Sequence, residues 1–283
     1  MALLNVEQWR QHVALDVGTA TTRIATGSSQ LFEIPSRFGA TKALRDGVVV
    51  DRDAAHHILE PLVECRRVFG IVKPIILGCA PTNASEHERG LLEDCIMKAG
   101  AASVSIIPEP LAAAVGAGLD VSSPYAQMVV DIGEGVTDCA VIRSGRLVAS
   151  YALRGGCCRM REAIAARQTA MCEDEADMLL RRCGICAPED ISGSVAVAAA
   201  VKPVLDEIAD GVDSFLRDLP DELGCDIIYG GICLTGGGAL VPGVRRLLEE
   251  RTGVSITRAR NPRRAVVEGA RAILPVVVML NRW

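Results

Sequence analysis

The stretch that decides the fold is residues 131–137, DIGEGVT, read together with residues 16–22, DVGTATT. Each begins with an aspartate directly after a short apolar run, VAL at 13–15 and MVV at 128–130. Each is followed by a second strand-like run and then by a turn. This pattern is typical of a β-hairpin whose first turn is an acidic loop rich in glycine and threonine. Two copies far apart in the chain predict two similar domains facing one another.

The rest of the sequence alternates between predicted helices and predicted strands. Helices are predicted at residues 53–69, 86–99, 111–118, 160–183, 195–219, 242–252 and 263–274, and strands at 74–80, 104–107, 231–235 and 255–257. Ser85 and Glu88 have the spacing of a capping box at the start of the second helix. Strands that alternate with helices predict an α/β fold with both faces of each sheet covered.

Turns rich in glycine and threonine expose backbone N–H groups and hydroxyls that bind phosphate oxygens. The predicted donors are Gly18, Thr19, Ala20 and Thr22 in the first loop, and Gly133, Glu134, Gly135 and Thr137 in the second. Phosphate would repel the aspartate that heads each loop, so Asp16 and Asp131 are predicted to hold a hydrated Mg²⁺. Each loop taken alone is also consistent with a plain hairpin turn.

A third glycine loop and an isolated glutamate add to this pattern. Gly236, Gly237 and Gly238 follow a predicted strand and precede a helix. Three glycines let a flat ligand approach the backbone closely, which favours nucleotide contact over a plain strand–helix turn. Glu109 lies between two prolines that fix its backbone. Its carboxylate either complements the helix dipole or orients or deprotonates an attacking water, since phosphoryl transfer needs mainly positioning and charge neutralisation.

Composition excludes several classes of protein. The net charge of -5, without a broad basic block, predicts no nucleic-acid binding. No apolar run reaches the roughly 18 residues of a transmembrane helix, and the N-terminus lacks signal-peptide features, so a cytoplasmic location is predicted. The 11 cysteines lie in apolar segments and indicate a reducing compartment with buried thiols. Cys183 and Cys186 form a lone CxxC pair, which is either a metal site or two plain thiols.

These motifs, in this order, resemble the superfamily of actin, sugar kinases and heat-shock chaperone ATPases, and within it the bacterial rod-shape cytoskeletal family, MreB. The resemblance covers about residues 12–274 and rests on residues 16–20, 46–51, 109–118, 129–135 and 234–240. It implies two ribonuclease-H-like domains around a cleft for ATP or ADP with Mg²⁺. Residues 16–22 and 131–137 would be the two phosphate loops and 236–238 the adenosine loop. Glu109, Asp131 and Thr137 would be the catalytic residues.

The resemblance also implies a domain division and exposes departures from the family pattern. Domain I would comprise residues 1–122 and 265–283, and domain II residues 123–264. Only residues 35–45 separate the first hairpin from the segment at 46–51. The outer subdomain of the first half is therefore expected to be absent, and that of the second half to be trimmed. Family filaments use these outer parts in subunit contacts, so polymerisation remains open.

Two residues depart from the family pattern near the nucleotide. Leu180 stands where the family often has a lysine that meets the ribose, and Arg181 or Arg182 are alternative contacts. Glu134 stands where glycine is common in rod-shape proteins. An extra carboxylate there either helps to hold the metal or repels the γ-phosphate.

Two functions follow from the resemblance, and a third is disfavoured. The preferred one is an ATP-binding actin homologue in the cytoskeleton, cell shape or envelope assembly, with itself or a full-length rod-shape homologue as partner. The alternative is a non-polymerising ATP-dependent switch or chaperone-like factor, similar to the ethanolamine-utilisation protein of this fold. A small-molecule kinase is disfavoured because those chains are usually much longer. ATP hydrolysis is left open.

The two ends of the chain carry apolar residues whose role is open. Residues 1–10 have the spacing of a short interfacial helix for peripheral membrane contact, with a helix packed on the domain or a frayed terminus as the alternatives. Residues 275–283 are apolar and are expected to pack on the first domain or to form a contact surface.

Overall fold

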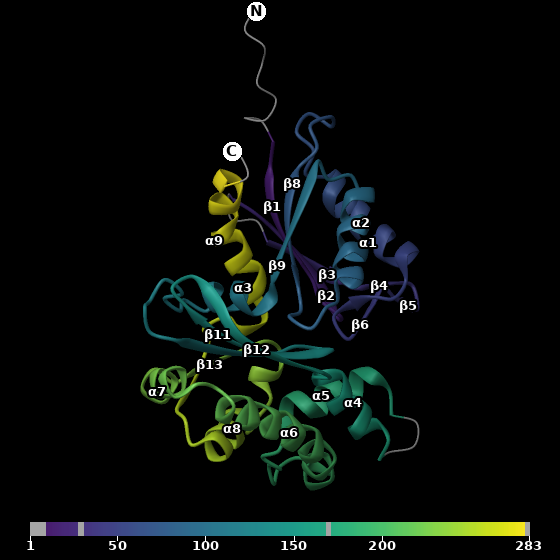
Figure 1. Cartoon of the computed structure of the whole chain (residues 1–283). Coiled ribbons are helices and arrows are strands. Elements are labelled where there is room, and N and C mark those ends of the chain that lie inside the picture. The colour runs from purple at the N-terminus through teal and green to yellow at the C-terminus, as the bar shows by residue number, and fades with distance from the viewer. Residues whose placement is uncertain (1–9, 28–30, 168–170, 281–283) are drawn as a thin grey trace, which may run out of the picture. The chain divides into compact units, whose positions relative to one another are not determined.

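The computed structural model describes residues 10–27, 31–167 and 171–280, and the chain divides into two compact units (Figure 1). The first unit is Met1–Gly116 with Val266–Trp283, and the second is Ala117–Ala265. Each unit contains a five-stranded mixed sheet built in the same order. The duplication predicted from the two acidic loops is therefore present in the fold.

The sheet of the first unit joins a three-stranded meander to two parallel strands. Its strands are β1 (His12–Val17), β2 (Thr21–Thr26), β3 (Leu31–Pro35), β8 (Ile75–Ala80) and β9 (Ser103–Pro108). They are ordered β3-β2-β1-β8-β9, with β1, β8 and β9 parallel. The carboxyl ends of these three parallel strands therefore meet at one edge of the sheet.

Helices cover both faces of this sheet. They are α1 (Arg52–Glu64), α2 (Glu86–Lys98), α3 (Glu109–Gly116) and α9 (Ala265–Leu280). Along β1 the side chains alternate between faces: Val13 and Leu15 pack in the core with α1 and α2, and Ala14 packs with α3 and α9. Helix α9 approaches α3 so closely that a Cβ on Gly269 would lie 1.7 Å from the carbonyl oxygen of Ala112.

The connection from β3 to α1 holds no outer subdomain. Residues 36–51 form only two small hairpins, β4 (Arg37–Phe38) with β5 (Thr41–Lys42), and β6 (Leu44–Arg45) with β7 (Val48–Val49). The expected absence of that subdomain is therefore a feature of the structure.

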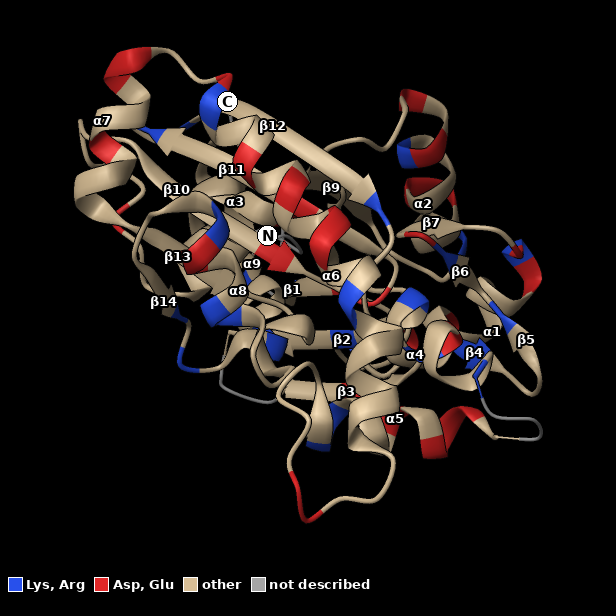
Figure 2. Ribbon diagram, turned by 90° about the horizontal axis from the view of Figure 1, so that it is seen from below, with Lys and Arg blue, Asp and Glu red and all other residues tan. Residues whose placement is uncertain are grey.

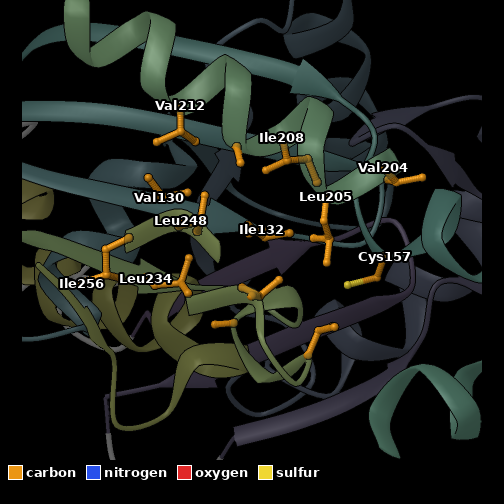
Figure 3. Packing of buried hydrophobic residues seen from close by; sticks show 14 of the residues in the cluster. Val130, Ile132, Cys157, Val204, Leu205, Ile208, Val212, Leu234, Leu248 and Ile256 are labelled. Atoms are coloured by element: carbon orange, nitrogen blue, oxygen red, sulfur yellow. The ribbon is translucent and has the colours of Figure 1, made fainter. Parts of the chain in front are cut away.

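The second unit repeats the sheet order of the first. Its strands are β10 (Gln127–Ile132), β11 (Val136–Arg143), β12 (Arg146–Arg154), β13 (Ile232–Thr235) and β14 (Ile256–Arg258), ordered β12-β11-β10-β13-β14. Its helices are α4 (Cys157–Ala165), α5 (Glu173–Cys183), α6 (Ser194–Arg217), α7 (Asp221–Gly230), α8 (Val244–Thr252), and the 3₁₀ turns η2 (Gly238–Leu240) and η3 (Pro262–Arg264). Inward side chains of β10 and β13, such as Val130, Ile132 and Leu234, pack against α6 and α8 (Figure 3).

Two predictions about helices were wrong, and one helix was missed. The helix predicted at 160–183 is two helices, because Cys172 and Glu175 form a capping box that starts α5 anew. Helix α7 was not predicted at all. The last helix does not end before Pro275 but continues to Leu280, although proline removes one backbone donor. Burial of both Leu274 and Val278 against the first unit's core accounts for its continuation.

The remaining predictions concern the N-terminal segment, membrane-spanning helices and the cysteines. Residues 1–10, for which an interfacial helix, a packed helix and a frayed terminus are the alternatives, lie outside the described residues except for Arg10. None of the described helices is both long enough and apolar enough to cross a membrane. Cys79, Cys139 and Cys233 are free and buried in strands. Cys183 is buried and Cys186 exposed, both as free thiols.

Candidate functional site

The first acidic loop lies between β1 and β2 at the carboxyl edge of the first sheet. The N–H of Gly18 donates to the carbonyl of Thr21 at 3.2 Å and closes the turn. Asp16 is buried, and Arg23, directly opposite on β2, bonds its carboxylate at 3.2 Å. Burial raises the pKa of Asp16, and the charge and hydrogen bond of Arg23 only partly oppose this. The loop therefore holds a desolvated carboxyl group at its head.

Ser36 supports this loop from within the protein. Its hydroxyl donates to the carbonyl of Gly18 at 2.6 Å and lies 2.8 Å from the hydroxyl of Thr22. Its N–H donates to the carbonyl of Ala20 at 2.9 Å. The Thr22 hydroxyl is fully buried, so in this structure it supports the loop, and its predicted contact with phosphate stays a prediction.

Glu109 lies at the same edge of the first sheet as Asp16. Asp16 is near the end of β1, Cys79 near the end of β8, and Glu109 directly follows β9. Burial raises the pKa of the Cys79 thiol well above its ordinary value, and the negative charges of Asp16 and Glu109 add to the shift. Asp16, predicted to bind metal, and Glu109, predicted to activate water, therefore both raise the pKa of Cys79, whose strand β8 lies between β1 and β9.

The second acidic loop repeats the geometry of the first. The N–H of Gly133 donates to the carbonyl of Val136 at 2.8 Å, as Gly18 does to Thr21. Asp131 is buried at its head. Thr137 is buried as well, and its hydroxyl donates to the carbonyl of Gly155 at 3.1 Å. Thr137 therefore fixes the loop to the chain that follows β12.

Backbone N–H groups at and just before the start of α4 donate to the carbonyl oxygens of the second acidic loop. Three successive carbonyls accept backbone N–H groups, Gly133 from Cys157 at 3.1 Å, Glu134 from Cys158 at 2.9 Å, and Gly135 from Gly155 at 2.7 Å. In a trans peptide, the carbonyl of one residue and the N–H of the next residue point in opposite directions. The carbonyls of Gly133 and Glu134 point toward the start of α4, so the N–H groups of Glu134 and Gly135 point away from it. Donors to an anion need this orientation.

The glycine loop after β13 packs directly on the second acidic loop. Strand β13 is parallel to β10 with Thr235 paired to Asp131. Gly236 has a φ of 82°, and a Cβ there would lie 2.2 Å from Oδ1 of Asp131. At Gly238 a Cβ would lie 2.2 Å from Cγ2 of Ile132. At Gly237 the nearest atom would be 4.0 Å away, so this middle glycine alone leaves space beside the backbone.

The segment around Leu180, which corresponds to the family's ribose-contacting motif, does not present this residue to solvent. Leu180 is buried in the core of the second unit. Its neighbour Arg181 is exposed and pairs with Asp177 one turn earlier. Arg182 is exposed too, so the predicted substitution of the lysine by either arginine stays a prediction.

Several supporting residues were missed by sequence reasoning. They are Ser36, Gly47, whose N–H donates to the Thr19 hydroxyl at 2.8 Å, Gly156, and the arginines Arg23 and Arg161. At Gly156 a Cβ would lie 2.4 Å from the carbonyl oxygen of Gly133. Arg23 alone had a signal in the sequence, because its place in the hairpin puts it opposite Asp16.

Each unit thus carries an acidic Gly/Thr loop at the carboxyl edge of its parallel strands, and this duplicated arrangement defines an actin-type fold. The family model for MreB/Mbl protein matches residues 29–169 and 183–282, and the chain belongs to that family. The cell shape-determining protein MreB of Escherichia coli K12 is 32% identical over 272 residues, covering 87% of this chain and 78% of that protein.

Solved structures share the fold at lower sequence identity. MreB5 of Spiroplasma citri, bound to AMPPNP, superposes with a TM-score of 0.87 at 24% identity, covering 96% of this chain and 98% of that one. A MamK double helical filament gives 0.78 at 17%, covering 95% and 99%. The ethanolamine utilization protein EutJ of Carboxydothermus hydrogenoformans gives 0.67 at 20%, covering 92% and 89%. These likenesses show the fold.

Proposed function

We propose that this chain binds ATP or ADP with Mg²⁺ and acts as a cytoskeletal protein in cell shape or envelope assembly. The observation that carries the proposal is the second acidic loop: the carbonyls of Gly133 and Glu134 accept from the start of α4, so the N–H groups that follow them point away from that helix. Membership of a family whose curated relatives are named cell shape-determining proteins supports it. So does the AMPPNP bound to MreB5 in its solved structure.

The residues present fit a magnesium nucleotide. A hydrated Mg²⁺ needs few protein carboxylates, because it keeps most of its waters and uses phosphate oxygens. Asp16 and Asp131 would each reach it through water. The outward N–H groups of Glu134 and Gly135 would take phosphate oxygens, with those of Thr19 and Ala20 as their counterparts in the first loop. The open side of Gly237 would face the adenosine.

We further propose the division into domain I, residues 1–122 and 265–283, and domain II, residues 123–264. Hydrolysis in this scheme needs a carboxylate that orients the attacking water, and Glu109 has that role, with Asp131 and Thr137 in support. The bound metal supplies charge neutralisation at the phosphates. If the protein hydrolyses ATP, Glu109→Ala or Asp131→Ala will abolish phosphate release with the fold intact. Normal release from either variant would refute the assignment.

Assembly is the point on which the two candidate functions differ. The MamK filament supports self-association in this fold. The EutJ likeness and the short β3–α1 connection favour the alternative, a non-polymerising ATP-dependent switch or chaperone-like factor. Sedimentation at high speed with Mg-AMPPNP decides between them. A nucleotide-dependent pellet, alone or with a full-length rod-shape homologue, supports the cytoskeletal function, whereas bound nucleotide without a pellet supports the switch.

Peripheral membrane contact is proposed from a turn in the first unit. Phe69 and Ile71 are 78% and 79% exposed at the turn between α1 and β8. Arg66, Arg67 and Lys73 lie close by in sequence. Apolar side chains at a tip with neighbouring cations suit the interface of an anionic bilayer. Flotation with vesicles containing anionic lipid tests this: the wild type should float and the F69S/I71S variant should not.

A further inference from the structure

Arg161 lies at the centre of a charge cluster that the proposed nucleotide chemistry does not use. It lies on α4, and the cluster joins the second acidic loop to α5, which packs beside α4 (Figure 2). Its Nη1 donates to Oε2 of Glu134 at 3.0 Å, and its Nη2 bonds the other carboxylate oxygen. Asp177 lies 3.5 Å from Nη1, and Glu173 lies 3.7 Å from Nη2.

The central pair of the cluster, Arg161 with Glu134, is largely shielded from water, whereas Asp177 and Glu173 lie at its exposed side. The side chain of Arg161 is 11% exposed and that of Glu134 18%. Burial lowers the pKa of the guanidinium, but the hydrogen bonds and charge of Glu134, with that of Asp177, outweigh this and raise it above the ordinary arginine value. The guanidinium is therefore firmly cationic, and a two-pronged pair with a carboxylate fixes the geometry of both partners.

The charge of Glu134 sits on the loop whose backbone N–H groups point outward. An unpaired carboxylate there would repel any phosphate oxygen brought to those N–H groups. With Arg161 in place, both oxygens of Glu134 are engaged by the guanidinium. Glu134 is thus held as a partner of Arg161 and not as a metal ligand.

We propose that Arg161 is a positioning residue that neutralises Glu134 and ties the second acidic loop to α5, so that the loop accepts a phosphate group. The inference rests on the proposed nucleotide binding and deepens it. It also resolves the two alternatives for Glu134, because the paired carboxylate neither supplies a metal ligand nor repels the γ-phosphate.

A double-mutant cycle tests this with Mg-AMPPNP and Mg-ADP as probes. Arg161→Met should weaken Mg-AMPPNP binding about tenfold, the scale expected of one unpaired charge near the phosphates. Glu134→Gln alone keeps the backbone N–H but removes one negative partner of Arg161, so it should bind Mg-AMPPNP more tightly than the wild type. The double variant should return to within about twofold of the wild type. The loss in Arg161→Met should be larger for AMPPNP than for ADP and should shrink at high salt.

Arg251→Met is the matched control. Arg251, on α8, also joins two helices of the second unit by pairing with Asp206 and Asp210 on α6, and none of these three residues belongs to the acidic or glycine loops. It should leave nucleotide affinity unchanged. Should Arg161→Met fail to fold, comparing Glu134→Gln with the double variant and with Arg161→Lys decides the matter, since all keep the loop free of an unpaired negative charge.

The outcomes separate the two levels of the account. A wild type that binds neither nucleotide overturns the proposed function and this inference with it. A wild type that binds, with Arg161→Met binding equally well, overturns the inference alone. A double variant that binds as weakly as Arg161→Met also overturns it, because Arg161 would then act by a route other than the charge of Glu134.

Discussion

Gly236 packs so closely on Asp131 that a Cβ on the glycine would lie 2.2 Å from Oδ1 of the aspartate. The contact joins the glycine loop after β13 to the acidic loop after β10. It exists because the two strands are parallel neighbours, with Thr235 opposite Asp131. The glycine loop after β13 is therefore packed directly against the second acidic loop.

Gly236→Ala is predicted to disrupt this contact and Gly237→Ala to spare it. The first adds a methyl group where φ is 82° and where backbone and carboxylate atoms are within 2.2 Å. Strain and steric overlap should cost about 1–3 kcal/mol. At Gly237 the nearest atom is 4.0 Å away. Urea unfolding of both variants measures the difference, and equal stabilities would show that the loop is not packed as described.

Ser36→Ala is predicted to loosen the first acidic loop. The change leaves the half-buried Gly18 carbonyl and the buried Thr22 hydroxyl without the Ser36 partner, which should cost about 1–3 kcal/mol. Ser122→Ala is the control, because the Ser122 hydroxyl bonds only the exposed Asp120 nearby in sequence. Denaturant unfolding should separate the two variants. A loss at Ser122 as large as that at Ser36 would contradict the supporting role.

Leu180→Lys is predicted to destabilise the second unit without improving nucleotide binding. Leu180 is 2% exposed and packs in the core, where an ammonium group would lie among apolar side chains. Burying such a charge costs several kcal/mol. Thermal unfolding and AMPPNP titration of the variant check both parts. A stable variant with tighter binding would mean that this position faces the ribose.

Asp16→Asn is predicted to raise stability at neutral pH in metal-free buffer. Burial, opposed by Arg23, raises the pKa of Asp16 above its ordinary value of 3.8. The contribution of Asp16 to the free energy of unfolding is therefore fully present below the pKa of the unfolded chain. It is lost as the pH rises through the pKa of the folded protein. In EDTA the variant should melt higher than the wild type at pH 8, with the gap closing towards pH 4. A gap independent of pH would contradict this. The control is Asp94→Asn, at an exposed position on α2.

The sequence was enough to predict the duplicated hairpins, the strands β8, β9 and β13, and the capping box at Ser85. Those features are local, because their signals are period-two apolar runs, glycine turns and a four-residue cap. Asp16, Asp131 and Gly236 lie at the carboxyl edges of their own sheets as the strand order requires. Their predicted roles toward a nucleotide stay predictions.

The rest depends on contacts between residues distant in sequence. Ser36 reaches Gly18, and Arg161 reaches Glu134, through packing that no local pattern reveals. Helix α9 passes Pro275 because tertiary burial outweighs a lost backbone bond. The break between α4 and α5 was missed since cysteine rarely serves as the N-cap that Cys172 provides.

Calorimetric titration of Mg-ATP into the wild-type protein tests the central claim most directly. The account predicts saturable heat with one nucleotide per chain, and loss of that heat in Gly236→Ala. Absence of any binding heat at millimolar Mg-ATP, from protein shown to be folded by its thermal transition, would contradict it. The chain would then be an actin-type fold retained for interaction with other proteins.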